Sequence, residues 1–446
     1  MRSNEEIIAF IRKTFNQPTG FIPLHAPLFI GNEKKYLEEC IDSTFVSSVG
    51  KFVDLFEVKI AEYTGSKKAV ACVNGTNALY LALKLAGAIQ NDEVLTQPLT
   101  FVATANAISY CGAHPVFLDV DIDTMGLSPK ALLNFLETNT AFNPSTNQLI
   151  NSSTNRPVTA CVPMHTFGHP CRIDEIVEIC THFHIPVIED AAESIGSTYK
   201  GKHTGTFGKI GILSFNGNKI ITTGGGGMLL FNDEELADKA KHLTTQAKLP
   251  HPWNFVHDEI GYNYRMPNIN AAIGLAQLEK AEILRQGRQR CAEYYYRELS
   301  ELNTIDLPVC YGPVENHSWH IFPIVIRPEA RLSRDEFIEK ISNKGIGVSV
   351  HYKPIHRMTY YKQAYNLDPQ NYPNAERIWK GTVSLPIYPD LTEDGLKYVC
   401  ETVKSLMNNR QNYFLPGEAK SGKSVNNNLL TNNTFELPNV KKITLL

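Results

Sequence analysis

Short apolar runs alternate with helical periodicity between residues 65 and 245. Val, Ile and Leu are concentrated in runs typical of buried strands, at 69–73, 93–97, 115–120, 158–164, 185–190, 211–215 and 227–231. Amphipathic helical spacing lies between them, at 77–87, 172–183 and 233–243, and Ser128-Pro129 marks the start of another helix. This alternation predicts an α/β fold: a mostly parallel sheet flanked by helices, with ligands bound beyond the carboxyl ends of the strands.

The pattern changes after about residue 255. We expect a long helix over 268–299, strands at 320–326 and 347–352, and helices near 333–345 and 393–407, which together are typical of a smaller α+β domain. Beyond 410 the chain is rich in Asn, Lys and Ser and has little periodicity. We therefore divide the chain into an N-terminal segment (1–24), a large ligand-binding α/β domain (25–255), a small C-terminal domain (256–409) and a flexible tail (410–446).

Candidate chemistry follows the ends of three predicted strands. Asn74-Gly75-Thr76-Asn77 opens a helix and suits an anion, although a plain turn with a helix cap is the competing interpretation. Asp190 follows Glu189 at the end of a strand, where an acid can pair with a protonated ring nitrogen. Lys219 lies in a loop rich in glycine and hydroxyl groups (214–227), where desolvation makes an amine nucleophilic; the alternative is a surface lysine beside a hairpin.

Composition narrows the class of protein. The 446 residues include 43 Lys and Arg against 46 Asp and Glu, a net charge of −3, which argues against a nucleic-acid-binding surface. No apolar run is long enough to cross a bilayer, and the acidic start does not resemble a secretory signal. The 9 Cys are scattered without close pairs. We expect a cytoplasmic protein with free thiols, without membrane or nucleic-acid partners.

Two sharper patterns lack the context that they need. Residues 417–424 match the phosphate-binding pattern G-x-x-x-x-G-K-S, but Pro416 precedes them and few residues follow to build a sheet. Cys and His residues gather between 161 and 184, yet their spacing fits no standard zinc site. We therefore predict no nucleotide site in the tail and no metal.

Several ordered motifs together resemble a known family. The chain is similar to the sugar-nucleotide aminotransferases of the DegT/StrS type, a branch of the aspartate-aminotransferase-like enzymes that use pyridoxal 5′-phosphate (PLP). The resemblance covers about residues 20 to 410. Its motifs lie at 74–79, 97–108, 163–170, 189–201, 214–219, 222–227, 261–279, 350–361 and 384–392. It implies a PLP-dependent aspartate-aminotransferase-like fold in which the large domain binds the cofactor.

The resemblance also implies roles for individual residues. Lys219 would form a Schiff base with PLP and later shuttle a proton, and Asp190 would pair with the ring nitrogen. Phe101 and Ala192 would cover the two ring faces. The phosphate would be bound by Gly75, Thr76, Asn77 and Ser214. Asn263 would reach the phosphate of the neighbouring subunit's cofactor, which implies a homodimer with shared sites; Arg265 is a further candidate for that region.

The sequence departs from the family pattern at two positions. Gly225 stands where Glu is frequent, which affects loop packing more than chemistry. Glu193 stands where Gln is frequent, near the cofactor's phenolic oxygen. A carboxylate there would be repelled by a phenolate, so Glu193 would be protonated, turned away, or used to bind a substrate group.

Within the family, the chain looks closest to enzymes that aminate C4 of UDP-linked 4-keto-6-deoxy-N-acetylhexosamines, as in the bacillosamine and legionaminic-acid pathways. The expected activity moves an amino group from L-glutamate, which leaves as 2-oxoglutarate, to such a sugar in surface glycan or nonulosonic acid biosynthesis. His351, His356 and Arg357 are candidates for binding the nucleotide diphosphate, with surface or interface roles as the alternative. Two other functions stay open: a PLP-dependent sugar dehydratase, in which we expect His instead of Lys219, and a non-catalytic regulatory protein that retains the fold.

Overall fold

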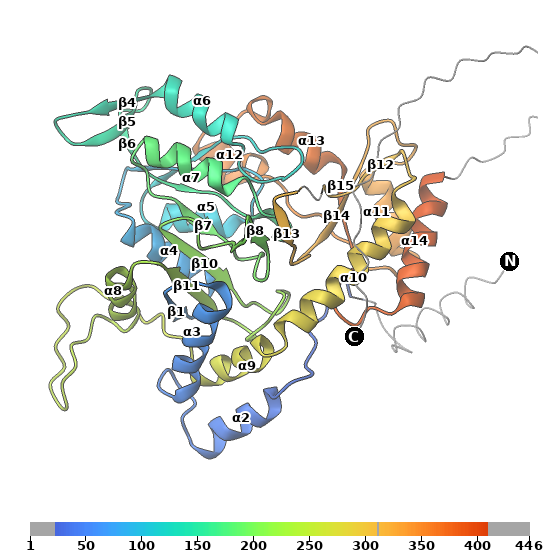
Figure 1. The fold of residues 1–446 in the computed structure, drawn as a ribbon. Helices are drawn as coiled ribbons and strands as arrows, with labels where there is room; N and C mark the ends of the chain where they lie inside the picture. The colour runs from blue at the N-terminus through green and yellow to red at the C-terminus, as the bar shows by residue number, and fades with distance from the viewer. Residues whose placement is uncertain (1–22, 310–311, 409–446) are drawn as a thin grey trace, which may run out of the picture. The chain divides into compact units, whose positions relative to one another are not determined.

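Nine of the strands between residues 65 and 245 form two sheets that meet edge to edge. The computed structural model describes residues 23–309 and 312–408. One sheet runs in the order β1 (Lys68–Cys72), β11 (Gly227–Phe231), β10 (Ile210–Ser214), β7 (Ile188–Asp190). The other runs β3 (His114–Phe117), β2 (Glu93–Thr96), β6 (Arg156–Val162), β5 (Gln148–Asn151), β4 (Thr140–Asn143). Parallel bridges from Cys161 to Val187 and from Met164 to Asp190 join β6 to β7 (Figure 1).

Most pairings between the predicted strands are parallel. Strands β3, β2 and β6 run parallel to one another, as do β7 and β10. Strand β11 is the exception among them, because it is antiparallel to both β1 and β10. Its register places Gly227 opposite both Cys72 and Ser214. The segments that follow β1 and β10 therefore leave the sheet side by side.

Helices cover both faces of this sheet, as the alternation predicts. Val70 and Cys72 of β1 pack into a core with α4 (Gly75–Leu85), α5 (Val102–Tyr110) and α8 (Glu234–Thr244). Ala69 and Ala71 point to the other face, where α2 (Glu33–Asp42), α3 (Lys51–Thr64) and α9 (Asn268–Leu278) close a second core. Helices α6 (Pro129–Asn139) and α7 (Ile173–His182) form a third core over β2 and β6.

The prediction of one long helix over 268–299 is wrong in one respect, because the helix ends at Leu278 and a second one follows. Helix α10 (Ala281–Leu299) begins beyond Lys280, whose backbone is not helical. The Glu279 carboxylate accepts hydrogen bonds from Asn32 (2.7 Å) and Tyr36 (2.6 Å), which tie the break to α2. Helix α9 therefore packs on α2 and α3, while α10 leaves for a separate core (Figure 1).

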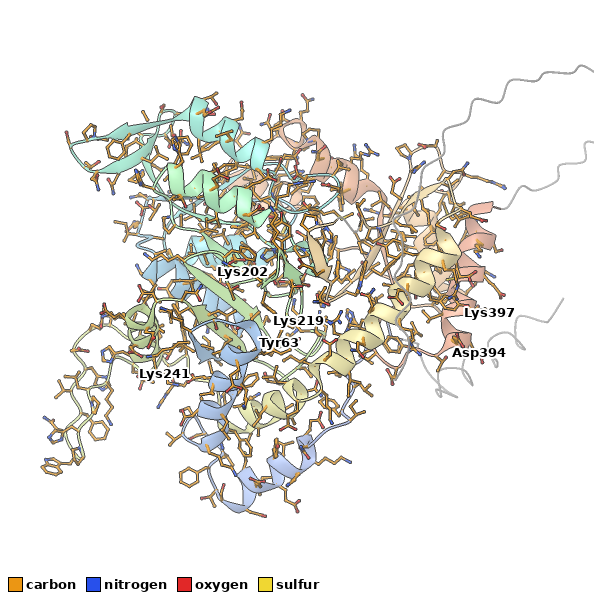
Figure 2. The ribbon with its side chains drawn as sticks, viewed as in Figure 1. Tyr63, Lys202, Lys219, Lys241, Asp394 and Lys397 are labelled. Atoms are coloured by element: carbon orange, nitrogen blue, oxygen red, sulfur yellow. The ribbon has the colours of Figure 1, made fainter. Side chains whose placement is uncertain are left out.

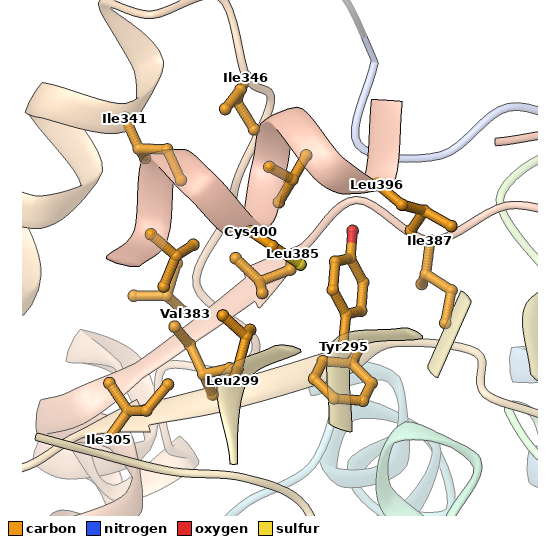
Figure 3. Packing of buried hydrophobic residues seen from close by; sticks show 14 of the residues in the cluster. Tyr295, Leu299, Ile305, Ile341, Ile346, Val383, Leu385, Ile387, Leu396 and Cys400 are labelled. Atoms are coloured by element: carbon orange, nitrogen blue, oxygen red, sulfur yellow. The ribbon is translucent and has the colours of Figure 1, made fainter. Parts of the chain in front are cut away.

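That separate core is built on the sheet β12 (Ile305–Asp306), β14 (Phe322–Ile326), β15 (Thr382–Leu385). Helices α10, α11 (Arg334–Ser342) and α14 (Glu393–Asn408) supply its apolar side chains, and Tyr295, Leu385 and Cys400 meet at its centre (Figure 3). The Tyr295 hydroxyl donates to the Pro386 carbonyl at 2.6 Å, which satisfies a polar group that is otherwise buried.

The prediction of a strand at 347–352 is wrong as well. Ser349 makes a single antiparallel bridge to Ser384, and the following residues leave the sheet. The remaining elements are short: β8 (Thr198–Tyr199), β9 (Lys202–His203), β13 (Val314–Asn316), α12 (Thr359–Ala364), α13 (Pro373–Gly381), and 3₁₀ turns η1 (Thr166–Gly168), η2 (Ile355–Arg357) and η3 (Pro369–Asn371).

The predicted domain boundaries stay predictions. Nearly all of the expected N-terminal segment (1–24), the tail (410–446) and the pattern at 417–424 lie outside the described residues. Within residues 23–309 and 312–408, no helix combines the length and the apolar character that a bilayer crossing requires.

Candidate active site

The ends of β1, β7 and β10 open into one cavity of about 460 Å³, a size that suits a small organic ligand. Its lining includes most residues that the sequence singled out: Gly75, Thr76, Phe101, Asp190, Ala192, Glu193, Ser214, Lys219 and His351. Lys219, labelled in Figure 2, lies in the loop between β10 and β11. The topology thus brings together residues from distant parts of the sequence.

Asp190 ends β7 as a buried carboxylate, with 4% of its surface exposed. Its Oδ2 accepts a hydrogen bond from the Thr104 hydroxyl (2.8 Å), and its Oδ1 accepts one from the Ala192 amide (3.2 Å). Both donors are neutral. Burial raises the pKa of Asp190, and these two hydrogen bonds oppose the rise only in part. A cation placed against Asp190 in the cavity would relieve this cost.

Lys219 contacts a second carboxylate, that of Glu193. The two side-chain atoms Nζ and Oε1 lie 3.2 Å apart, with the Lys219 side chain 12% exposed and that of Glu193 fully buried. Although burial alone would raise it, the pKa of Glu193 is lowered, chiefly by the Lys219 ammonium and by His320. This geometry was not among the three states expected for Glu193: the structure has an ionised carboxylate that faces the lysine.

The third part of the cavity surrounds the start of α4. The Asn74 side chain caps this helix by accepting a hydrogen bond from the Asn77 amide (2.8 Å), so the helix N-terminus points its positive end at the cavity. Gly75 packs so closely on Ser214 that an added Cβ would lie 2.8 Å from the Ser214 Cβ. The small residue therefore keeps the backbone and the Ser214 hydroxyl within reach of one anionic group.

Four residues from the sequence prediction do not line this cavity. Asn77 contributes its backbone to the helix cap instead. Asn263 is exposed and pairs through its backbone with Thr245, beside the segment between α8 and α9. His356 and Arg357 lie on η2, and both are hydrogen-bonded to the Glu376 carboxylate, His356 at 2.7 Å and Arg357 at 2.7 and 2.6 Å.

Arg265, the further candidate beside Asn263, lines a separate cavity of about 220 Å³ with Gly50 and Lys241. Among the residues that the structure describes, the one His and carboxylate group close enough to hold an ion is His242, Asp258 and Glu259, which lies outside 161–184 and is partly exposed.

The structure adds residues that the sequence did not single out. Tyr352 lines the cavity, and its hydroxyl donates to Glu193. Thr104 holds Asp190 from α5, and His320 approaches Glu193 from the segment that precedes β14. Tyr352 follows His351 in a motif already noted, so adjacency was a usable signal. Thr104 also lies within a motif already noted, at 97–108, but nothing local marks His320, whose partner lies far away in the sequence.

Comparison with known proteins identifies the chain. The sequence pattern of the DegT/DnrJ/EryC1/StrS aminotransferase family matches residues 29–404. The chain belongs to this family. It is 37% identical to GDP-perosamine synthase of Escherichia coli O157:H7 over 391 residues, which is 87% of this chain and 100% of that relative. It is 36% identical to EpsN of Bacillus subtilis (strain 168), named as a pyridoxal phosphate-dependent aminotransferase, across 86% of this chain and 95% of that relative.

Comparison with a solved structure supports the predicted fold. PseC of Helicobacter pylori, an aminotransferase involved in the biosynthesis of pseudoaminic acid, superposes with a TM-score of 0.79 at 27% identity, over 87% of this chain and all of that one. The predicted aspartate-aminotransferase-like fold is therefore confirmed. The chain is a PLP-dependent sugar-nucleotide aminotransferase, so the dehydratase and the non-catalytic alternatives are set aside.

The cavity fits the cofactor of this family. PLP carries a protonatable ring nitrogen, an aldehyde and a phosphate. The cavity offers a buried carboxylate whose hydrogen-bond donors are neutral, an amine, and a helix N-terminus with hydroxyl groups beside it. Each group of the cofactor thus meets a side chain or dipole of complementary charge.

Proposed function

We propose that the enzyme transfers an amino group from L-glutamate to C4 of a nucleotide-linked 4-keto-6-deoxy sugar, with Lys219 and Asp190 as its central residues. The observation that carries this proposal is the cavity that both residues line, with an amine and a buried carboxylate facing the same space. PLP, when bound, supplies a ring that takes up the electron pair released at the amine-bearing carbon.

The protein's own residues hold and move charge around that ring. Asp190 is the counter-ion for a protonated ring nitrogen, and Thr104 and Ala192 fix the direction of its two oxygens. Lys219 binds the cofactor covalently and afterwards carries a proton to and from the substrate's amine-bearing carbon. Gly75, Thr76 and Ser214 bind the phosphate. Both halves of the reaction need the same proton transfer, so one lysine serves both.

We assign Phe101 and Ala192 to the two faces of the ring. Phe101, 52% exposed, lies at the start of α5, while Ala192 lies beside Asp190 in the cavity wall. His351 also lines the cavity, and its Nδ1 is hydrogen-bonded to Ser384 at 2.8 Å. We assign His351 to substrate binding, since its second ring nitrogen is not used by that contact.

A second copy of the chain completes the site. Among the described residues that line the cavity, Lys219 is the one Lys or Arg, and it is used to bind the cofactor covalently, so a dianionic phosphate lacks a cationic partner. The segment between α8 and α9 extends away from the sheet (Figure 1) and exposes Trp253 (80%), Phe255 (73%) and Ile260 (85%). Exposed apolar groups of this size favour burial against a partner. We assign this segment, with Asn263 at its base, to a homodimer interface.

Mixed dimers test the shared site. Lys219→Ala and Asn263→Ala damage different halves of the composite site, so each variant alone has low activity. Random mixing after mild dissociation makes heterodimers in which one of the two sites is intact, restoring up to about a quarter of the activity. No recovery, with exchange verified by mass spectrometry, contradicts the sharing of sites.

The sugar is the finer part of the proposal. From its motifs we expect UDP-2-acetamido-2,6-dideoxy-4-keto-hexose as the acceptor. A GDP-linked 4-keto-6-deoxy sugar is the second candidate, because a relative across nearly the whole described chain is named for a GDP-linked product. A panel of UDP-, GDP- and dTDP-4-keto-6-deoxy sugars, incubated with enzyme and glutamate and followed by mass spectrometry, separates these. Amination of the UDP sugar with the highest kcat/KM supports our assignment, and a preference for the GDP sugar replaces it with the second candidate.

A further inference from the structure

The carboxylate of Glu193 accepts hydrogen bonds on both of its oxygens. Its Oε1 accepts from Lys219 Nζ (3.2 Å) and from the Tyr352 hydroxyl, and His320 Nε2 lies 3.5 Å away. Its Oε2 accepts from the Phe167 amide at 2.9 Å. These contacts come from four separate segments of the chain. The position and charge of Glu193 are therefore fixed by the tertiary fold and not by its own loop.

The backbone around Glu193 is held in conformations that cost energy. Phe167 lies in the left-handed region (φ 63°, ψ 11°), where a residue with a side chain is disfavoured, and this turn points its amide at Glu193. Gly168 follows with φ 88°, and a Cβ there would lie 2.2 Å from the Ser318 hydroxyl oxygen. The Ser318 hydroxyl donates to the Glu193 carbonyl at 2.9 Å. Strained backbone that persists around one carboxylate points to a functional constraint.

The other titratable groups near the pair are neutral or point elsewhere. Burial lowers the pKa of His25 to about 4 and that of His320 to about 3, and it also lowers that of His351, so none of the three is cationic at pH 7. Burial raises the pKa of Tyr352, which keeps its proton. Two further charged groups influence this region. Asp190 accepts a hydrogen bond from the Thr104 hydroxyl. The buried Arg288 donates hydrogen bonds to the carbonyls of Trp319, His320 and Ile387.

We propose that Glu193 is a positioning residue that holds the Lys219 amine in place and in its charged form, with Tyr352 moderating this hold. Lys219 and Glu193 are the closest pair of opposite charges in the cavity, and Tyr352 shares the oxygen that faces the amine. This inference deepens the proposed function, and it rests on that function only for its effect on turnover.

For catalysis, the charge of Glu193 affects the pH range in which Lys219 can act. An ammonium donates protons but cannot accept them, so Lys219 must lose its proton before it acts as a base or a nucleophile. A carboxylate 3.2 Å away opposes that loss and moves the active pH range upward. Removing the Glu193 charge should therefore move the acid limb of the kcat/KM profile to lower pH.

The direct test labels lysines in the cofactor-free protein. Acetylation by acetic anhydride is measured by mass spectrometry between pH 6 and 11, and the midpoint of reactivity at Lys219 gives its pKa. In Glu193→Gln that midpoint falls by about 1–3 pH units, the range expected for loss of an opposite charge at this distance. In Tyr352→Phe the midpoint rises, because Glu193 loses a competing hydrogen-bond donor.

The control is a lysine and glutamate pair outside the cavity, in which the Glu57 side chain is 14% exposed and that of Lys241 is 40% exposed. Lys241 contacts Glu57 at 2.6 and 2.8 Å and lies away from Lys219 (Figure 2). Glu57→Gln should lower the midpoint of Lys241 and leave that of Lys219 unchanged. An unchanged or higher midpoint at Lys219 in Glu193→Gln, with Lys241 responding normally in Glu57→Gln, overturns the proposal.

Two features keep the test decisive. Should Glu193→Gln fail to fold, Tyr352→Phe decides alone: a raised midpoint supports the proposal, and a lowered or unchanged one overturns it. In the loaded protein, the pH at which the absorbance of the linkage between the cofactor and Lys219 changes should fall in Glu193→Gln, a spectroscopic change that a purely structural role does not produce. Because the labelling uses cofactor-free protein, it can fail while Lys219 is still found to bind the cofactor, which separates this inference from the proposed function.

Discussion

Asp190→Asn is the substitution whose effects the structure defines most fully. The variant keeps the size of the side chain and removes its charge from a site that is 4% exposed. In the loaded enzyme this breaks a buried charge pair with the ring nitrogen, which costs about 3–5 kcal/mol. The Kd for PLP should therefore rise by at least about 100-fold.

The same substitution should not harm the cofactor-free protein. Burial raises the folded-state pKa of Asp190 above the value of about 3.9 for an unfolded aspartate. The folded state therefore favours the protonated carboxyl, and the free energy of unfolding decreases as pH rises from about 4 through the folded pKa. The asparagine side chain of the variant does not ionise, so the variant lacks this loss. Its Tm at pH 7, without cofactor, should equal or exceed that of the unmodified chain.

Two measurements check these opposite effects of Asp190→Asn on PLP affinity and on stability. Absorbance titration gives the Kd for PLP, and thermal unfolding of the cofactor-free proteins between pH 5 and 8 gives the stability. Asp119→Asn is a matched control, because Asp119 accepts from the Asn374 and Ala375 amides and does not line the cavity. A Kd for Asp190→Asn within about threefold of the unmodified value, or a Tm reduced across the whole pH range, would refute the counter-ion role.

Two further substitutions probe the cavity wall and the residues beyond it. Gly75→Ala places a Cβ 2.8 Å from that of Ser214, so the cavity wall must shift and PLP affinity should fall about tenfold. The control is Gly217→Ala, whose added Cβ meets nothing within 4 Å, so this variant should bind PLP normally. Equal affinities of the two variants in a PLP titration contradict the close packing. Arg357→Lys loses the two hydrogen bonds that Arg357 donates to Glu376, so Tm should fall by a few degrees while the KM for the sugar stays unchanged. A raised KM with a normal Tm would instead place Arg357 in substrate binding.

The sequence predicts those parts of the site that lie directly after strands. Asp190, Ser214 and Gly75 follow short apolar runs, and in a largely parallel sheet such ends meet at one edge. The hydrogen bond from Thr104 to Asp190 spans 86 residues, and that from Tyr352 to Glu193 spans 159. No local pattern encodes contacts of this kind, because they depend on how separate elements pack.

The errors in the fold have the same origin. The run 268–299 contains no proline, so helical periodicity gives no reason to expect an end at Leu278. That end depends on Glu279 binding Asn32 and Tyr36, which precede it by more than 240 residues. Residues 347–352 alternate as a strand does, but His351 and Tyr352 are drawn to the cavity instead of the sheet. In both cases tertiary contacts override the local pattern.

Borohydride reduction of the purified protein, followed by peptide mapping, tests the central claim most directly. The account predicts a yellow protein that loses its colour on reduction, with the cofactor's mass fixed to the peptide that contains Lys219 and with no labelling in Lys219→Ala. Cofactor attached to a different lysine, or equal labelling in Lys219→Ala, contradicts the account.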